Sequence, residues 1–395
     1  MKKKIIIITL IIITTISIVS ILIYQKYENN KIDIKLVTNK EVEVYNNVKV
    51  SDFIENKDNI EIIDDYMVNT DKIGTEAIFF QYKHNGFKYK DSFDIKVVDK
   101  TNPTILINKT YTITKDSDID LTNSILCGDN YTDDPNCYVE GEYDISKVGD
   151  YELKYIGIDS SNNKTVEDFV LKVIEPKNNN DNANPPVTTP FQDIISTYKK
   201  DNTSIGIDVS KWQGDIDFKK VKDSGAEFVI IKVAGEKTLD SGIEIDPYFK
   251  NNIENALNNN LQVGVYYNSK ANSLEDAKKE ANFVLDAIKD YDVSLGVAYD
   301  WESWSAFNNY KVSFHTLNQI ATIFLDTIQE KGYNPILYGS EYYLNLIWNL
   351  DKYDTWLANY SKNINYNKPY IMWQLCNNGR IDGINGNVDI DVLYK

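Results

Sequence analysis

The stretch LGVAYDWE, residues 295–302, joins a short apolar run to two carboxyl groups. Its apolar part, residues 295–300, has the length and composition of a buried parallel strand. In an extended strand, residues i and i+2 point to the same face, so Asp300 and Glu302 are expected to enter one cavity. Their Cα atoms would lie about 6.6 to 7 Å apart. Taken alone, an Asp-x-Glu pair is more often a solvated strand end than a catalytic site.

Similar apolar runs recur through residues 203–395, and helical patterns separate the first five of them. The runs cover residues 205–209, 228–233, 263–267, 295–300 and 335–338, and then, more closely spaced, 356–358, 370–374 and 388–392. One helix is expected to begin at a capping box, Ser273 to Asp276, and another to end at Gly332. We therefore predict the α/β fold class, with a modified TIM-like β/α barrel of eight strands and about five helices.

Four acidic residues fall where these strands end. Asp208 ends the first strand, Asp300 and Glu302 end the fourth, and Asp389 lies in the last. In such barrels the functional side chains sit at the carboxyl ends of the strands. Carboxyl groups crowded into an aromatic pocket repel one another, which raises the pKa of one and keeps it protonated as a general acid. Cleavage of a glycosidic bond needs such an acid and a negative group beside the oxocarbenium centre.

The order of motifs in residues 203–395 resembles glycoside hydrolase family 25, the Chalaropsis-type lysozymes or N-acetylmuramidases. The motifs are Gly206 to Gly214, Asp300-Trp301-Glu302, Trp373-Gln374 and Gly383 to Asp389. The resemblance covers essentially the whole region. The sequence departs from the family's pattern at three places: Gly235-Glu236 replaces a usual Glu-Gly pair, Tyr267-Asn268 replaces His and an aromatic residue, and Asp391 stands where Asn is common. These departures bear on substrate preference more than on the catalytic carboxyl groups.

The resemblance implies retaining hydrolysis of the β-1,4 bond between N-acetylmuramic acid and N-acetylglucosamine in peptidoglycan, without a cofactor. Glu302 would protonate the leaving oxygen and later activate water. Asp300 would stabilise the positive reaction centre or orient the acetamido group of the sugar. Asp208 and Asp389 would tune protonation and hold substrate. Spacing does not decide whether a carboxylate or the acetamido group attacks.

Sugar binding should use aromatic platforms and amide groups. The candidates for substrate binding are Tyr266, Tyr338, Trp373 and Gln374. The alternative for each is that it packs the barrel. Trp301 has the opposite parity from the two acids beside it and is expected in the core.

A repeat precedes the barrel. Lys72-Ile73-Gly74 and the strands after it are echoed 75 to 76 residues later. The two copies, residues 31–99 (the first β module) and residues 100–175 (the second β module), resemble bacterial immunoglobulin-like modules of cell-surface proteins, which are more often spacers than binders. Cys127 and Cys137 in the second copy are candidates for a disulfide in an oxidising exterior, although spacing alone does not establish the geometry.

The N-terminal segment predicts a membrane anchor. Residues 1–4 form a basic tail, and residues 5–24 are apolar enough to cross the ~30 Å hydrocarbon core as a helix. Lysines on the N-terminal side favour a cytoplasmic N-terminus and an extracellular catalytic domain at the cell wall. The alternative is a cleaved signal peptide. Residues 176–202, rich in Asn and Pro, are predicted to be a linker.

Composition excludes several other functions. A net charge of −17 argues against nucleic acid as a partner, because phosphate backbones are bound by clustered Lys and Arg. His84 and His315 lie far apart and offer no metal-ligand spacing, so no metal site is predicted. A cysteine-hydrolase site at Cys376 lacks any local motif that pairs it with a histidine.

The sequence thus predicts a membrane-tethered muramidase whose partners are peptidoglycan glycan strands, the cell membrane and other proteins of the cell envelope. Its role would be local opening or remodelling of the wall. One alternative is a non-catalytic scaffold that uses the barrel to bind wall glycan. Another is a related hexosaminidase that acts on a chitin-like polymer.

Overall fold

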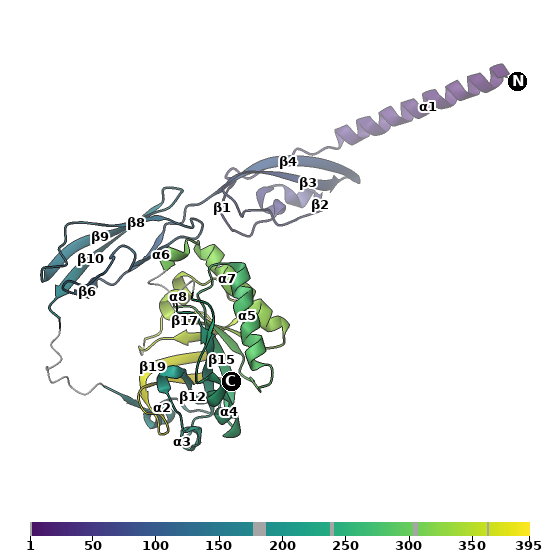
Figure 1. Ribbon diagram of the computed structural model, residues 1–395. Coiled ribbons are helices and arrows are strands. Elements are labelled where there is room, and N and C mark those ends of the chain that lie inside the picture. The colour runs from purple at the N-terminus through teal and green to yellow at the C-terminus, as the bar shows by residue number, and fades with distance from the viewer. Residues whose placement is uncertain (1, 177–186, 238–240, 303–306, 362) are drawn as a thin grey trace. The chain divides into compact units, whose positions relative to one another are not determined.

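The computed structural model describes residues 2–176, 187–237, 241–302, 307–361 and 363–395. The chain divides into two compact units, Met1–Lys100 and Thr101–Lys395. The first unit therefore holds the N-terminal helix and the first β module. The second unit holds the second β module and the barrel (Figure 1).

The first unit begins with helix α1 (Lys2–Asn29). Residues Lys3–Asn29 have a mean hydropathy of 3.0 and bury none of their apolar window within the protein. By length and composition this helix suits a membrane span, and a signal sequence has the same character. Tyr27, near the end of the helix, stacks on Tyr89 of the first β module with ring centroids 4.6 Å apart.

The first β module is one four-stranded sheet in the order β1-β4-β3-β2. Its strands are β1 (Glu41–Glu43), β2 (Glu61–Ile62), β3 (Gly74–His84) and β4 (Phe87–Val98), and it also has the short 3-10 helices η1 (Val50–Phe53) and η2 (Lys57–Asn59). Strand β1 runs parallel to β4, whereas β3 and β4 form an antiparallel hairpin.

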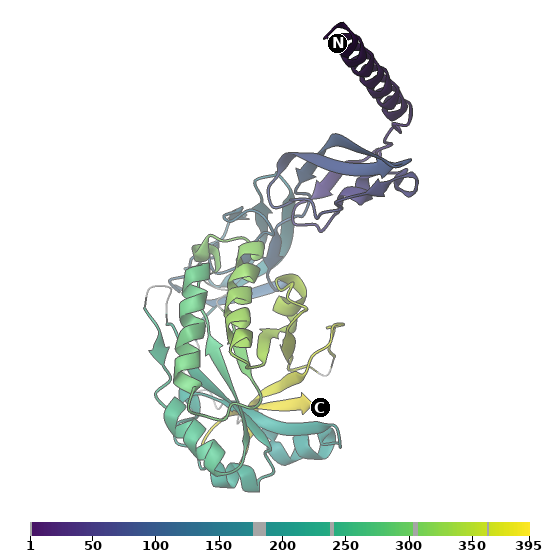
Figure 2. The same ribbon diagram turned by 90° about the vertical axis from the view of Figure 1, so that its right-hand side faces the viewer.

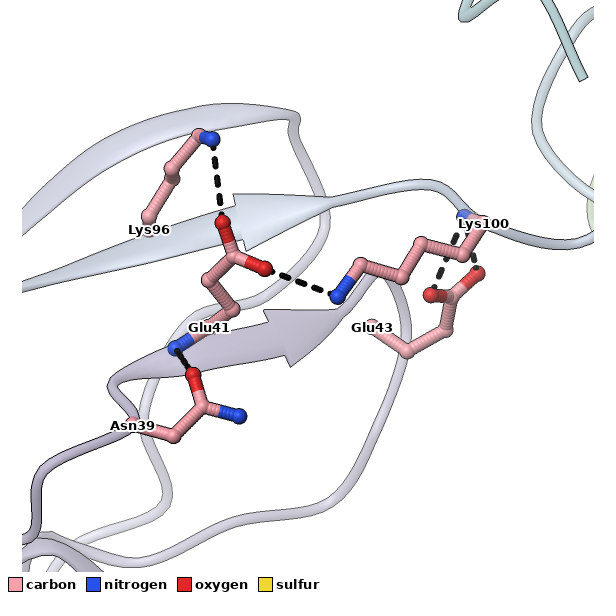
Figure 3. A network of polar contacts seen from close by, with 5 residues as sticks. All are labelled: Asn39, Glu41, Glu43, Lys96 and Lys100. Carbon is pink, nitrogen blue, oxygen red and sulfur yellow. Dashed lines mark hydrogen bonds and ion pairs between the residues drawn. The ribbon is translucent and has the colours of Figure 1, made fainter.

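An ionic network holds the end of this module (Figure 3). Glu41 accepts from the ammonium groups of Lys96 at 3.1 Å and Lys100 at 2.7 Å. The backbone N–H of Lys100 donates to both carboxylate oxygens of Glu43, at 2.9 and 3.1 Å. The network ties the last residue of the first unit to strand β1.

The second β module repeats this topology. Its four-stranded sheet has the order β6-β10-β9-β8, with β6 parallel to β10. The strands are β5 (Thr104–Leu106), β6 (Thr110–Thr114), β7 (Leu126–Gly128), β8 (Asn136–Glu140), β9 (Gly149–Ile158) and β10 (Lys164–Ile174). Strands β5 and β7 pair separately, and a disulfide joins Cys127 of β7 to Cys137 of β8. The likeness of both modules to immunoglobulin-like domains stays a prediction.

The barrel is a closed ring of strands. In order along the chain they are β12 (Thr203–Val209), β13 (Phe228–Gly235), β15 (Gln262–Asn268), β16 (Val297–Asp300), β17 (Pro335–Ser340), β18 (Asp354–Ala358), β19 (Met372–Arg380) and β20 (Val388–Tyr394). Neighbours from β12 to β19 are parallel, and β20 closes the ring by pairing antiparallel with both β19 and β12. Each of the predicted apolar runs overlaps one of these strands. A short strand β14 (Glu244–Ile245) pairs with β13 outside the ring.

Helices surround this ring, and α5 and α7 pack side by side on it (Figure 2). The elements are η3 (Lys211–Gln213), α3 (Phe218–Asp223), α4 (Phe249–Asn258), α5 (Leu274–Ile288), α6 (Phe307–Tyr310), α7 (Phe314–Glu330) and α8 (Glu341–Leu346). Helix α5 begins as predicted, because the Ser273 hydroxyl accepts from the backbone N–H of Asp276. The apolar stripes of these helices pack on the outer faces of the strands.

The interior of the ring is filled by a separate apolar cluster. Its buried members include Phe228, Ile230, Ala298, Ile336, Tyr338, Trp356 and Met372. Because this packing fills the barrel, only side chains at the strand ends can line an open site.

The linker is shorter than the sequence predicted. Residues 177–186 lie outside the described residues, but Thr189–Pro190 form strand β11 beside β19, and Phe191–Tyr198 form helix α2. Phe191 and Ile194 of α2 are buried in the outer core of the barrel. The prediction failed here because polar and proline-rich composition hid two apolar residues at helical spacing.

Candidate active site

The strand register brings the predicted acids to one end of the barrel. Asp208 of β12 pairs with Asp389 of β20, and Asp300 of β16 is flanked by Asn268 of β15 and Tyr338 of β17. Parallel strands present their carboxyl ends at the same rim, so these side chains meet there. The pairing therefore assembles the candidate site from strands that are distant in sequence.

Gln374 of β19 connects the two sides of this rim. Its Nε2 donates to Asp208 Oδ2 at 2.8 Å and to Asp389 Oδ2 at 3.3 Å. Its Oε1 accepts from the hydroxyl groups of Tyr338 and Tyr360, both at 2.9 Å. Gln374 is only 2% exposed, so these bonds form largely out of contact with water. The amide fixes two carboxyl groups and two phenols relative to one another.

Asp300 is buried beside an amide partner. Asn268 Nδ2 donates to Asp300 Oδ2 at 2.8 Å, and among the described residues the other carboxyl oxygen, Oδ1, has no hydrogen-bond partner. Burial raises the pKa of Asp300 well above its usual range, and the charge of Glu302 raises it further. The bond from Asn268 and the charge of Lys232 act in the opposite direction. The site therefore favours the protonated form of at least one member of the Asp300–Glu302 pair.

Glu302 directly follows the end of β16, and the residue taken as a whole is exposed to solvent. The protein packed around its carboxyl group still raises its pKa, and the positive charge of Lys232 partly opposes this. Asp389 is half-buried, and burial together with the charge of Glu302 raises its pKa to about 6. A carboxyl group with a raised pKa is suited to donate a proton near neutral pH.

Asp208 and Asp391 form the buried half of the acidic cluster. Burial raises the pKa of both well above the usual range, and the neighbouring charge of Asp389 adds to the shift. The indole N–H of Trp356 donates to Asp391 Oδ1 at 2.9 Å. Asp391, one of the three departures noted in the sequence, thus lies within the acidic cluster itself.

Sequence reasoning missed two further members of the site. Lys232 of β13 has its ammonium group 5.7 Å from the ring centroid of Tyr266, and burial lowers its pKa although Asp300, Asp246 and Glu302 oppose this. Tyr360, which bonds to Gln374, is the other. A lysine inside the apolar run of a predicted buried strand was the available signal, because an unpaired buried charge is costly.

The predicted substrate-binding residues divide into two groups. Tyr338 and Gln374 lie in the hydrogen-bonded cluster, and Tyr266 packs edge-on against Trp356 inside the ring. Trp373 lies outside both groups, and its part in substrate binding stays a prediction. It packs edge-on against Tyr198 of α2, and its indole N–H donates to the carbonyl of Asn359, because it has the opposite parity to Gln374 on β19. Trp301 is fully buried, as parity predicted.

The cysteine-hydrolase alternative finds no support. Cys376 is a buried free thiol, and burial raises its pKa to about 11. A thiol with so high a pKa is almost wholly protonated at neutral pH and is a poor nucleophile.

Comparison with known proteins gives three similarities. The sequence model of the glycosyl hydrolases family 25 matches residues 207–384, which include Asp208, Asp300 and Glu302 and end before Asp389. The uncharacterized protein YegX of Escherichia coli O6:H1 is 31% identical over 200 residues, which cover 48% of this chain and 68% of YegX. The autolytic lysozyme of Clostridium acetobutylicum is 28% identical over 189 residues, which cover 47% of this chain and 54% of that protein.

One solved structure extends the comparison. The modular autolysin LytC of Streptococcus pneumoniae, in complex with a synthetic peptidoglycan ligand, has 23% sequence identity and a TM-score of 0.45. The similarity covers 61% of this chain and 56% of LytC.

Proposed function

The chain belongs to glycosyl hydrolases family 25 and is a glycosidase of the lysozyme type, and on this premise we propose that its barrel cleaves the β-1,4 bond between N-acetylmuramic acid and N-acetylglucosamine in peptidoglycan, with retention. The observation that carries this proposal is the meeting of Asp208, Asp300 and Asp389 at one rim of the barrel, with Glu302 directly after it. Burial raises the pKa of all four carboxyl groups, and the charge of a neighbouring carboxyl group adds to the shift at Asp208, Asp300 and Asp389.

Glu302 acts as the acid and then as the base. Its raised pKa keeps a fraction of the carboxyl groups protonated near neutral pH, and its exposure gives a bound glycan access to the proton. In the first step Glu302 gives this proton to the glycosidic oxygen as the bond to the anomeric carbon breaks. In the second step the resulting carboxylate takes a proton from water as water attacks the anomeric carbon, which restores the acid.

Asp300 stabilises the positive charge that develops between these steps. Its oxygen Oδ1 is buried and has no hydrogen-bond partner within the part of the chain that the structure describes, so it would accept from an acetamido N–H of a sugar that reaches it. Accepting that bond would direct the acetamido oxygen toward the anomeric carbon as an internal nucleophile. Direct attack by the Asp300 carboxylate is the other route, and both give retention.

The other polar residues of the rim hold the substrate and set the protonation of the acids. They are Asp208, Asp389, Gln374 and the tyrosines. The hydroxyl groups of Tyr338 and Tyr360 share one acceptor, Gln374 Oε1. The exposed ring of Tyr360, 55% accessible, gives a face on which a pyranose can stack. Tyr266 lines the same end of the barrel, where Lys232 lies against its ring.

Helix α1 tethers the enzyme in the cell membrane, with the N-terminus in the cytoplasm and the barrel at the cell wall. The support is the exposed apolar surface of Lys3–Asn29 and the lysines at its N-terminal end. A tethered enzyme acts at high effective concentration and needs no charge attraction to the wall, which accommodates the net charge of −17. We assign it to local wall opening, in company with other envelope proteins.

The test is release of reducing ends from purified peptidoglycan by the full-length chain in detergent, with mass spectrometry of the new ends. Glu302→Gln should lower the rate at least about a hundredfold, because general acid–base catalysis contributes 10² to 10⁴. Glu275→Gln, an exposed acid on α5, is the matched control and should match the parent.

Three outcomes separate the alternatives. Muramic acid ends that are lost in Glu302→Gln support the proposal. New N-acetylglucosamine ends would mean that the bond specificity is wrong and favour the hexosaminidase alternative. A folded parent chain that binds glycan but releases no ends would favour the scaffold.

A further inference from the structure

The second β module packs on helix α6 and the start of helix α7, residues 307–314. Strand β7 contributes Leu126, whose side chain is fully buried in the outer core of the barrel. Gly128, two residues later, faces the rings of Phe307 and Phe314, and a Cβ added at Gly128 would lie 2.6 Å from both. The close approach of backbone to rings therefore requires glycine at this position. Figure 1 shows α6, which carries Phe307, beside this module.

Polar contacts join the same two surfaces. Asn308 Nδ2 donates to the carbonyl of Ile125 at 3.2 Å, and Asn308 Oδ1 accepts from the N–H of Cys127 at 3.3 Å. One amide thus bonds to the backbone on both sides of Leu126, as a neighbouring strand would. Lys311 adds an ion pair with Asp134 at 3.1 Å.

The start of helix α7 also bonds to the second β module. The backbone N–H of Ser313 donates to Asp133 Oδ1 at 2.8 Å, and that of Phe314 donates to the carbonyl of Asp129 at 2.7 Å. The first N–H groups of a helix have no partner within the helix. The module supplies partners for them and thereby fixes where α7 begins.

This interface continues to the catalytic pair through Trp301. The ring of Phe307 packs edge-on against Trp301 with centroids 5.8 Å apart, and it lies 5.3 Å from the ring of Phe314. Trp301 is fully buried and stands between Asp300 and Glu302 in the sequence. A shift of Phe307 would therefore shift Trp301 and the two acids on either side of it.

We propose that the second β module positions the end of β16 for catalysis, with Gly128 and Asn308 as positioning residues that act through Phe307 and Trp301. The inference rests on the function proposed for Asp300 and Glu302. It assigns the module a part in the reaction beyond that of a spacer. The other explanation of the interface is that it only stabilises the fold.

The two explanations differ in what substitution at the interface should do. Gly128→Ala would push the rings of Phe307 and Phe314 away, and Asn308→Ala would remove both bonds to the backbone around Leu126. A positioning role predicts that kcat falls about tenfold to a hundredfold, since a misplacement of about 1 Å can cost a hundredfold, while KM changes little. Phe307→Leu should lower kcat less, because it keeps most of the apolar volume.

Matched controls come from the same protein. In Gly149→Ala on β9, the new Cβ would make only ordinary contacts, at 3.7 Å from Tyr151. Asn255→Ala on α4 removes hydrogen bonds to Asn251 at 2.7 and 3.0 Å, bonds of the same kind within another helix. Both controls should keep kcat within about twofold of the parent, since surface substitutions away from special features change little.

The experiment compares these variants in the full-length chain, with kcat and KM measured on soluble glycan fragments well below each unfolding midpoint. Hydrogen exchange of β16 and α6 is followed in parallel and should become faster in Gly128→Ala and Asn308→Ala only. Folded variants with unchanged kcat, or with unchanged exchange in β16, would overturn the inference. If Gly128→Ala and Asn308→Ala both fail to fold, Phe307→Leu decides by the same two measurements. A parent chain without activity would refute the proposed function instead, and the exchange measurement would still test the coupling of module to strand.

Discussion

Asp391 adds a buried carboxyl group to the acidic cluster of the candidate site. Its side chain is wholly buried, its Oδ1 accepts from Trp356, and its charge raises the pKa of Asp208. Three carboxyl groups, those of Asp208, Asp389 and Asp391, therefore share a small volume in which full ionisation is unfavourable. Part of the cluster holds protons that the unfolded chain would release at neutral pH.

This arrangement predicts a stability that falls as pH rises. The pKa of Asp391 is raised in the folded state, so its contribution to stability is complete below the unfolded pKa, about 3.9, and is lost as pH rises toward the folded pKa. Asp391→Asn removes this loss and keeps an acceptor for Trp356. The difference in thermal unfolding midpoint, variant minus parent, should therefore increase as pH rises from about 4 to 8. Parallel curves for parent and variant over that range would contradict the prediction.

At the scale of elements, helix α2 belongs to the barrel rather than to a linker. Phe191 is 2% exposed and packs in the outer core with Ile194, while β11 just before it pairs with β19. The elements before β12 therefore cover the side of the ring where β19 carries Trp373, whose ring meets Tyr198 of the same helix. Their removal would uncover the strand that also carries Gln374.

Phe191→Ala tests the contribution of this helix. Removing a buried phenylalanine ring costs about 3 to 5 kcal/mol, so the free energy of unfolding of the barrel should fall by that order. Val187→Ala is the matched control in the same segment, because Val187 is 85% exposed, and it should change stability by less than about 0.5 kcal/mol. Denaturant unfolding of the full-length chain measures both. Equal effects of the two substitutions would show that α2 does not contribute to the core.

Apolar strands were the easiest elements to predict from sequence. Runs such as Phe228 to Val233 have the length and the β-branched residues of a buried strand. Alternation along the strand then predicted that Asp300 and Glu302 share one face and that Trp301 points to the core. Helices α2 and α6 were missed, because eight and four residues give too little periodicity. Contacts between distant segments, such as Tyr360 with Gln374, carry no local signal at all.

At the scale of the whole molecule, the division into two units falls at Lys100 rather than in the Asn/Pro-rich segment. The second β module and the barrel form one compact unit, and the first β module with α1 forms the other. The boundary between the two units therefore falls between the two copies of the repeat.

Membrane attachment is the prediction that belongs to this scale. The full-length chain should sediment with membranes and remain there in high salt, because apolar burial of helix α1 does not depend on charge. A chain that lacks residues 1–30 should be soluble and keep its kcat on soluble glycan fragments. Release of the full-length chain by salt alone, or recovery of a processed chain that lacks the helix, would refute the anchor.

The repeat has an evolutionary consequence. The two sheets have the same strand order, β1-β4-β3-β2 and β6-β10-β9-β8, as expected for descendants of one duplicated ancestor. About 75 residues before strand β7, the first copy has η1, whose Val50 and Phe53 are buried in its own module. In the second copy the corresponding region carries a disulfide and a glycine that meets the barrel. If the two copies arose by duplication, only the second is constrained by contact with the barrel, so sequence divergence among homologues should be greater in the first.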